Sequence, residues 1–335
     1  MINQIINSDC LSGLKQLPDG SVNCCVTSPP YFGLRNYGVD GQIGLEATPE
    51  IFVAKMVEIF KEVKRVLRDD GTLWLNLGDS YSGGGCGSRD SNKWPKQSRN
   101  DHMPVHAKKN TGLKEKDLIG IPWRVAFALQ ADGWYLRQDI IWHKTNPMPE
   151  SVLDRCTKAH EYIFMLSKSP RYYYDAESIR EQRTSDENAK TFRGGAYTKN
   201  ETFDNAEGGK RKVVGNTRVD KQRGHSRRHA GFNDRWDGMT KEEQGSMGRN
   251  KRDVWSVATA PFKESHFATF PPELIRPCIL AGCPGGGVVL DPFMGAGTTA
   301  LVALQERRTY VGFELNPEYI KIIEKRLKTV EVKLF

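Results

Sequence analysis

Apolar positions along the chain change from strand-like to helical spacing and back again. Val22–Val26 is a short apolar run that ends at two prolines, as a buried strand does. Over Phe52–Leu67 apolar residues instead recur at helical spacing, and Thr48 can cap the start of that helix. We expect Asp70-Gly71 to end this helix, so that a new strand covers Thr72–Leu77.

The same alternation continues on both sides of a polar middle segment. Strands and helices that alternate at this spacing predict an α/β fold with a mostly parallel sheet and helices on both faces. The further strands are expected at Tyr135–Trp142, Tyr162–Leu166, Val288–Leu290 and Tyr310–Phe313, and the further helices at Pro122–Ala131, at Pro272–Ala281 and from Thr298 and Pro317 onward.

Three segments organise the chain. Residues 1–176 and 254–335 carry the predicted strands and helices. Neither segment has enough strands for a full sheet, so we expect the two to join in one domain. Residues 177–253 lie between them as an insertion of different composition.

Most of the excess positive charge lies in this insertion. The whole chain has 49 Lys plus Arg and 41 Asp plus Glu, and its net charge of +8 favours a polyanionic partner. Residues 180–252 hold 18 of the basic and 11 of the acidic residues, with neither Leu nor Ile, and can hardly build a core. Aromatic residues scattered among Arg and Lys suit a surface that contacts nucleic acid, but a solvated linker has the same composition. Ser82–Asp117 is a second basic stretch.

Several classes of protein are not expected. No run of about 18 apolar residues occurs, so a membrane-spanning protein is not expected. The N-terminus also lacks the basic flank and apolar core of a signal peptide. The seven cysteines include no CxxC pair, so we expect reduced thiols in the cytoplasm and no metal site. The two histidines of the run HSRRH have no cysteine pair nearby, so we do not expect them to bind zinc. We expect Arg227 and Arg228, between them, to contact phosphates.

A glycine-rich turn near the C-terminus has the pattern of a nucleoside-binding site. The strand Val288–Leu290 leads into the run DPFMGAGTT, where a helix begins. Gly295 and Gly297 let a ligand approach the backbone, and the helix N-terminus favours a negative group. Glu314 ends the following strand and can accept hydrogen bonds from both hydroxyls of a ribose. A dinucleotide fingerprint would have a third glycine near Ala300, so the pattern indicates a nucleoside cofactor without identifying it.

The run Thr27-Ser28-Pro29-Pro30-Tyr31 can bind an amino group on a nucleobase. Its two prolines fix the backbone and lack N–H donors, which leaves the carbonyl of Pro29 as an outward acceptor beside the hydroxyl of Ser28. Two acceptors at a fixed angle can hold both amino hydrogens. Tyr31 offers a flat face on which a base taken out of the duplex can stack. Alone, a Pro-Pro turn of this kind more often only closes a strand.

Together, TSPPY and DPFMGAGTT resemble the motifs of the amino-methylating DNA methyltransferases, which use S-adenosylmethionine. The order of catalytic motif, recognition region and cofactor motif is similar to that of the beta group of this family. The resemblance covers nearly the whole chain apart from residues 180–252. It implies a circularly permuted class I methyltransferase sheet, Rossmann-like and seven-stranded with one antiparallel strand, and a target-recognition region inserted at 177–253.

The resemblance also implies a role for individual residues. Catalysis is assigned to Ser28, Pro29, Pro30 and Tyr31. Cofactor binding is assigned to Asp9, which meets the adenine amino group, to Phe267, Asp291, Phe293, Gly295, Gly297 and Thr298 toward the methionine end, and to Glu314 for the ribose. Lys144 lies in a run that resembles the strand end beside the flipped base, and we expect it, with Arg227 and Arg228, to contact DNA.

The resemblance leaves the target base and the partners open. Ser before Pro-Pro is commoner among cytosine N4 enzymes than among adenine N6 enzymes, so N4 of cytosine is favoured and N6 of adenine is the alternative. A more remote alternative is a nucleic-acid-binding protein that has lost catalysis, and another is an enzyme acting on RNA or on protein glutamine. The substrate expected is double-stranded DNA, in a cytoplasmic protein associated with the nucleoid. A cognate restriction endonuclease and a homodimer are open possibilities.

Overall fold

A mixed eight-stranded sheet forms the centre of the computed structural model, which describes residues 2–34, 37–83, 112–182, 203–204, 210–211, 240, 248–259 and 270–331. Only β5 runs antiparallel to its neighbours in this sheet, which confirms the predicted fold class. In spatial order the strands are β1 (Gln4–Asn7), β10 (Thr309–Glu314), β9 (Val288–Asp291), β2 (Val22–Thr27), β3 (Leu67–Leu77), β5 (His160–Ser167), β4 (Tyr135–His143) and β8 (Val254–Ser256).

The expected number of seven strands is wrong by one within the described residues. The additional edge strand is β8, which follows the insertion and pairs in parallel with the end of β4. Its three residues are too few to show an apolar alternation in the sequence.

The two halves of the domain join in the middle of this sheet. Strand β2 from the N-terminal half pairs in parallel with β9 from the C-terminal half, with Cys24 opposite Val289 and Cys25 opposite Leu290. The pairing confirms that residues on either side of the insertion share one sheet. It also brings the TSPPY and DPFMGAGTT segments to the same edge, because each follows the carboxyl end of one of these two parallel strands.

Helices cover both faces of the sheet and create two cores. Neighbouring residues of β2 point to opposite faces: Cys25 packs in the core with α1, α2 and α3, and Cys24 in the core with α7, α8 and α9. Both cysteines are fully buried, as the sequence predicts for an apolar strand. The helices are α1 (Cys10–Leu14), α2 (Pro49–Val66), α3 (Ile121–Ala131), α7 (Pro272–Gly282), α8 (Thr298–Gln305) and α9 (Pro317–Glu331).

Helix α2 starts where the sequence predicts and ends earlier. The hydroxyl of Thr48 accepts a hydrogen bond from the backbone N–H of Ile51, which confirms the predicted cap. The predicted stop at Asp70-Gly71 is wrong, because the backbone is already extended at Leu67. Leu67 pairs with Val22 of β2, so pairing with the sheet ends the helix before the glycine does.

The chain divides into two compact units. One comprises residues 1–179 with 252–335 and contains the eight-stranded sheet, and the other comprises residues 180–251. In the second unit, the short strands β6 (Phe203–Asp204) and β7 (Lys210–Arg211) pair antiparallel. None of the helices in the described part of the chain is both long and apolar enough for a membrane span.

Candidate active site

A cavity of about 680 Å³ opens where the parallel strands end. Its walls include residues that directly follow four strands: Ser8 after β1, Ser28 after β2, Gly78 after β3 and Pro292 after β9. Ligands of open α/β sheets bind at this edge, because loops diverge there while the strands hold their starting points rigidly. The antiparallel strand β5 adds residues from its beginning, among them Glu161.

One end of the cavity carries the predicted cofactor residues. Phe293, Gly295 and Glu314 all line it. The carboxylate of Glu314 accepts hydrogen bonds of 2.8 Å from the N–H groups of Gly295 and Asn316, one on each oxygen. Burial raises the pKa of Glu314 to about 7. Because each carboxylate oxygen can accept a second hydrogen bond, this acid suits a pair of ribose hydroxyls.

Asp9 borders the same end of the cavity. Its side chain caps α1 by accepting a 2.9 Å hydrogen bond from the N–H of Ser12. This backbone hydrogen bond lowers the pKa of Asp9, so the group is a carboxylate acceptor at neutral pH. An acceptor here agrees with its predicted contact to an adenine amino group, which stays a prediction. Phe267 lies outside the described residues.

Asp291 stands behind the cavity wall. Its buried carboxylate accepts hydrogen bonds from Thr27 Oγ1 at 2.6 Å, Thr299 Oγ1 at 2.7 Å and the N–H of Phe293 at 3.0 Å. Burial raises its pKa to about 6. These bonds fix the end of β9 against the end of β2 and hold the turn that carries Gly295. Asp291 is absent from the cavity lining.

Gly297 and Thr298 also support the turn from outside the cavity. Gly297 precedes α8 with φ 75°, and a Cβ on it would lie 2.4 Å from Ile323 Cγ2 of α9. Glycine is therefore required for packing as well as for the backbone angle. Thr298 is buried as the first residue of α8. Contact of Asp291, Gly297 and Thr298 with a cofactor stays a prediction.

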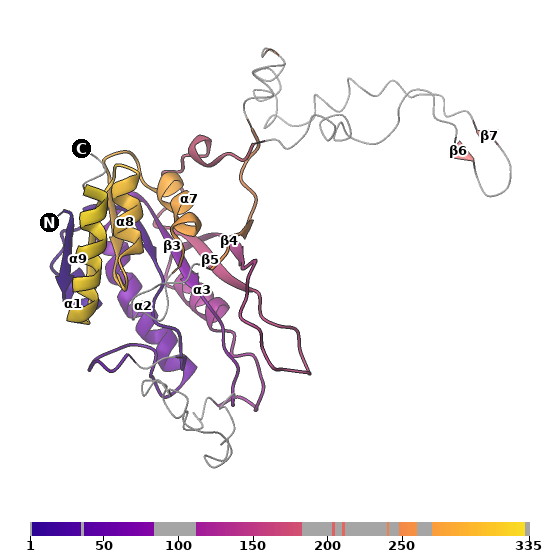
Figure 1. The fold of residues 1–335 in the computed structure, drawn as a ribbon, viewed down its shortest axis with the longest axis horizontal. Helices are drawn as coiled ribbons and strands as arrows, with labels where there is room; N and C mark the ends of the chain where they lie inside the picture. Colours follow the sequence, from indigo (N-terminus) through magenta and orange to yellow (C-terminus); the bar gives the residue numbers. More distant parts are fainter. Residues whose placement is uncertain are drawn as a thin grey trace. The chain divides into compact units, whose positions relative to one another are not determined.

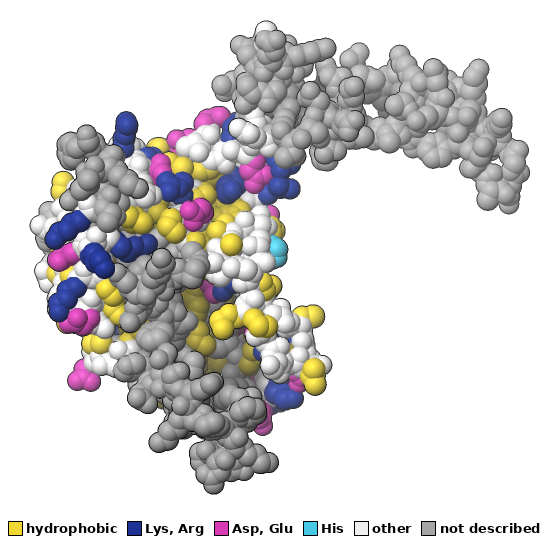
Figure 2. Space-filling model, viewed as in Figure 1, with side chains coloured by type: hydrophobic (Ala, Val, Ile, Leu, Met, Phe, Trp, Pro, Cys, Tyr) yellow, Lys and Arg dark blue, Asp and Glu magenta, His cyan; other side chains and the backbone are white. Residues whose placement is uncertain are grey.

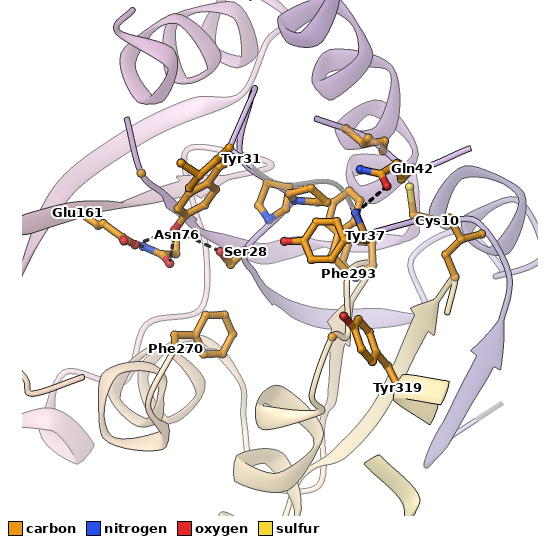
Figure 3. Close-up of a pocket in the computed structure, with 18 of the residues that line it drawn as sticks. Cys10, Ser28, Tyr31, Tyr37, Gln42, Asn76, Glu161, Phe270, Phe293 and Tyr319 are labelled. Carbon is orange, nitrogen blue, oxygen red and sulfur yellow. Dashed lines mark hydrogen bonds between the residues drawn. The ribbon is translucent and has the colours of Figure 1, made fainter. Parts of the chain in front are cut away.

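The TSPPY segment follows β2 and lines the cavity on the side toward β3 and β5. Tyr31 Oη lies 3.5 Å from Ser28 Oγ, 3.1 Å from Asn76 Oδ1 and 2.6 Å from Glu161 Oε2 (Figure 3). The ring lies against Gly78, where a Cβ would come within 2.5 Å of Tyr31 Cε2. Burial and the charge of Glu161 raise the pKa of Tyr31, so its hydroxyl remains protonated and donates. The tyrosine is thus held at both its hydroxyl and its ring.

A family model described as DNA methylase matches residues 22–325. The chain belongs to the DNA methylase family. The Type II methyltransferase M.Cfr9I of Citrobacter freundii is 48% identical over 324 residues, which cover 97% of this chain and 87% of that protein.

Two solved structures of low sequence identity share the fold of this DNA methylase. The PvuII DNA methyltransferase (cytosine-N4-specific) has a TM-score of 0.59 and 16% identity, covering 97% of this chain and 86% of its own. A putative DNA modification methylase from Thermus thermophilus, complexed with S-adenosyl-L-methionine, has a TM-score of 0.53 and 21% identity, covering 96% and 92%. This chain is accordingly a DNA methyltransferase of the N4/N6 group, whose methyl donor is the expected S-adenosylmethionine.

The DNA methylase site contains two polar residues that the sequence analysis did not assign to it. Asn76 is a polar residue inside the apolar strand β3, and its amide donates to Glu161 Oε2 at 3.3 Å and to the carbonyl of Tyr162 at 3.1 Å. Glu161 binds Tyr31 and lies opposite Trp142 in the β4–β5 register. A polar residue inside an apolar strand is a signal by which the sequence could have identified Asn76 as a site residue. Glu161 could be identified only from the antiparallel pairing of β4 with β5.

Lys144 faces the cavity of the DNA methylase, where its Nζ lies 2.5 Å from Glu161 Oε1. The ammonium also lies 4.8 Å from the centre of the Trp142 ring. Its contact with DNA stays a prediction, and Arg227 and Arg228 lie outside the described residues. Where side chains are described, no cluster of three or more His, Cys, Asp or Glu residues could hold a metal ion.

Proposed function

We propose that this DNA methyltransferase moves the methyl group of S-adenosylmethionine to the exocyclic amino group of a base flipped out of double-stranded DNA, with N4 of cytosine as the preferred target. The observation that supports this most is the shared cavity. Ser28 and Tyr31 line it on the side of β2 and β3, and Phe293, Gly295 and Glu314 line it on the side of β9 and β10. A reaction between two bound molecules requires such a shared space, because binding both in one cavity holds the reacting atoms in the right orientation and removes the need for a chance collision.

In this proposal the chain orients both partners, and no strong base is needed before the amino nitrogen attacks. S-adenosylhomocysteine would be the leaving product, and the methylated nitrogen would release its extra proton to water after the transfer. S-adenosylmethionine supplies a methyl group made electrophilic by its sulfonium. Ser28 Oγ and the Pro29 carbonyl accept hydrogen bonds from the amino group and make its nitrogen more nucleophilic, while Pro30 fixes the backbone angle. The carboxylate of Glu314 binds the ribose hydroxyls, and Asp9 accepts from the adenine amino group. Asp291 does not line the cavity, but its hydrogen bond with Thr27 fixes the segment that binds the base relative to the segment that binds the cofactor.

The choice of cytosine rests on Ser28. A neutral serine is a weaker acceptor than the carboxylate that adenine N6 enzymes of this family more often carry. The neighbour named cytosine-N4-specific points the same way, although its likeness is one of fold. N6 of adenine is the alternative product.

DNA recognition belongs, in this proposal, to the inserted region 177–253 with Arg227 and Arg228, together with Lys144 beside the cavity. A cognate restriction endonuclease fits relatives named as Type II methyltransferases. The proposal also includes a homodimer and a cytoplasmic location in association with the nucleoid.

Sequencing of a genome that expresses the protein, with detection of modified bases, tests this function. We expect N4-methylcytosine at one short sequence, absent from the same host without the gene. A host that lacks its own amino-methyltransferases gives the cleanest background. N6-methyladenine would replace the cytosine assignment, and DNA without any added methylation would refute the proposed reaction.

A further inference from the structure

The loop between β4 and β5 exposes large apolar side chains beside the active-site cavity. In this loop Met148 is 86% exposed and Leu153 is fully exposed. Figure 1 shows the loop extending from the sheet at the lower right, and Figure 2 shows exposed hydrophobic side chains in that region of the surface. Apolar side chains presented this openly mark contact surfaces when other features support a partner.

The loop is braced from several sides. The Asn146 amide donates to the carbonyl of Thr259 at 3.1 Å and accepts from its N–H at 2.7 Å, so it pins the start of the loop to the segment after β8. Arg155 forms an ion pair with Glu150 and lies 4.1 Å from the centre of the Tyr81 ring. The exposed tip is therefore held in place by contacts at its base.

Met148 occupies a special place in this braced loop. It stands between Pro147 and Pro149, which fix their own φ angles and restrict the residues before them. Met148 and Pro147 both line the cavity that contains Ser28, whereas Leu153 does not. A stiff backbone thus presents one long, adaptable side chain at the mouth through which a base must enter.

We propose that Met148 inserts into the DNA duplex where the target base leaves the stack and fills the gap next to its orphaned partner base. An apolar wedge of this kind replaces part of the stacking that is lost on base flipping. The acidic residues of the loop do not oppose a phosphate backbone, because Glu150 is paired with Arg155 and Asp154 with Lys116 at 2.7 Å. This inference rests on the proposed function, since only a flipped base leaves such a gap.

The test compares single-turnover methylation by the wild-type chain, Met148→Ala and Leu153→Ala. Two duplexes of the mapped methylation site are used, one with the target base paired and one with an abasic site opposite it. Flipping costs least where the base is already unpaired, so a wedge matters least there. Methylation of the paired duplex by the wild-type chain tests the proposed function alone. The wedge is tested by whether the rate lost in Met148→Ala depends on the pairing of the target base.

We expect Met148→Ala to lose about tenfold in rate on the paired duplex and to recover nearly fully on the duplex with the abasic site. Leu153 is still more exposed than Met148 on the same loop but lies outside the cavity, so Leu153→Ala should match the wild type on both duplexes. An equal loss on both duplexes would overturn the proposal, because Met148 would then act on the base inside the cavity. Equal losses in the two variants, or no loss in Met148→Ala, would also overturn it.

Discussion

Thr27 donates a 2.6 Å hydrogen bond to Asp291 across 264 positions of the sequence. Thr27 directly precedes Ser28, and Asp291 directly precedes the turn that carries Phe293 and Gly295. One buried hydrogen bond therefore joins the segment expected to hold the base to the segment expected to hold the cofactor.

Asp291→Ala should lower the free energy of unfolding, because this one carboxylate accepts three hydrogen bonds. Three donors lose their acceptor, the hydroxyls of Thr27 and Thr299 and the N–H of Phe293. We expect a loss of about 3 kcal/mol in the free energy of unfolding, measured by denaturant titration. Thr299→Val, which removes a single hydroxyl, should cost about 1 kcal/mol. Equal stability of Asp291→Ala and wild type would show that this carboxylate does not hold the two strands together.

Tyr31 and Glu161 should act as a pair in methyl transfer. Tyr31→Phe removes the hydroxyl that meets Glu161, and Glu161→Gln removes the charge that meets both Tyr31 and Lys144. We expect each variant to lower the single-turnover rate about tenfold and the double variant to lose little more than either one, as coupled residues do. Glu58→Gln, which breaks an exposed pair with Lys55 on α2, is the matched control and should be silent. Independent, multiplying losses would refute the coupling.

Glu314 should make cofactor affinity depend on pH. Burial raises its folded pKa above the ordinary value of 4.5 to about 7, so folding favours the neutral acid and stability falls as the group ionises with rising pH. Ribose hydroxyls bind the charged form, so affinity for S-adenosylmethionine should rise about tenfold between about pH 6 and about pH 8. Calorimetry should show this rise for wild type and none for Glu314→Gln.

Glu314→Ala should weaken S-adenosylmethionine by about 2 kcal/mol at neutral pH, because two hydroxyls lose a charged acceptor. Equal affinity in the variant and the wild type would move the ribose site elsewhere, and tight binding of NADH would oppose a methyltransferase cofactor.

Removal of residues 180–252 should separate recognition from catalysis. These residues carry +7 of the net charge of +8, so the remnant should bind DNA weakly, with a log–log salt slope that flattens by about 0.9 for each lost phosphate contact. The remnant should still fold and bind S-adenosylmethionine, since the eight-stranded sheet lies outside this segment. DNA affinity against salt, on specific and scrambled duplexes, is the measurement. Discrimination that survives the deletion would place recognition elsewhere, with Ser82–Asp117 the next candidate.

The local pattern of the sequence was sufficient for most elements of the sheet. The cap at Thr48 and the strands that begin at Val22 and Val288 all follow from residue-level rules, and the structure has them. The early end of α2 could not be predicted from the sequence, because it depends on the pairing of Leu67 with Val22 in the sheet. Strand β8 was missed because it is defined by its partner β4 rather than by its own pattern.

The candidate site divides in the same way. Ser28, Tyr31, Gly295 and Glu314 sit in recognisable motifs, and all four line the cavity. Glu161 belongs to no such motif, and only the register between β4 and β5 brings it to Tyr31. The sequence likewise did not distinguish cavity-facing residues from those that support the wall.

The most direct test of the central claim is nucleoside analysis of DNA after incubation with the purified protein and S-adenosylmethionine. We predict that the wild-type chain forms N4-methylcytosine, and that Ser28→Ala binds S-adenosylmethionine equally well but transfers methyl about 100-fold more slowly, because one of two amino acceptors is lost. Unchanged transfer by Ser28→Ala, or a methyl group on a ring carbon of the base, would contradict the account.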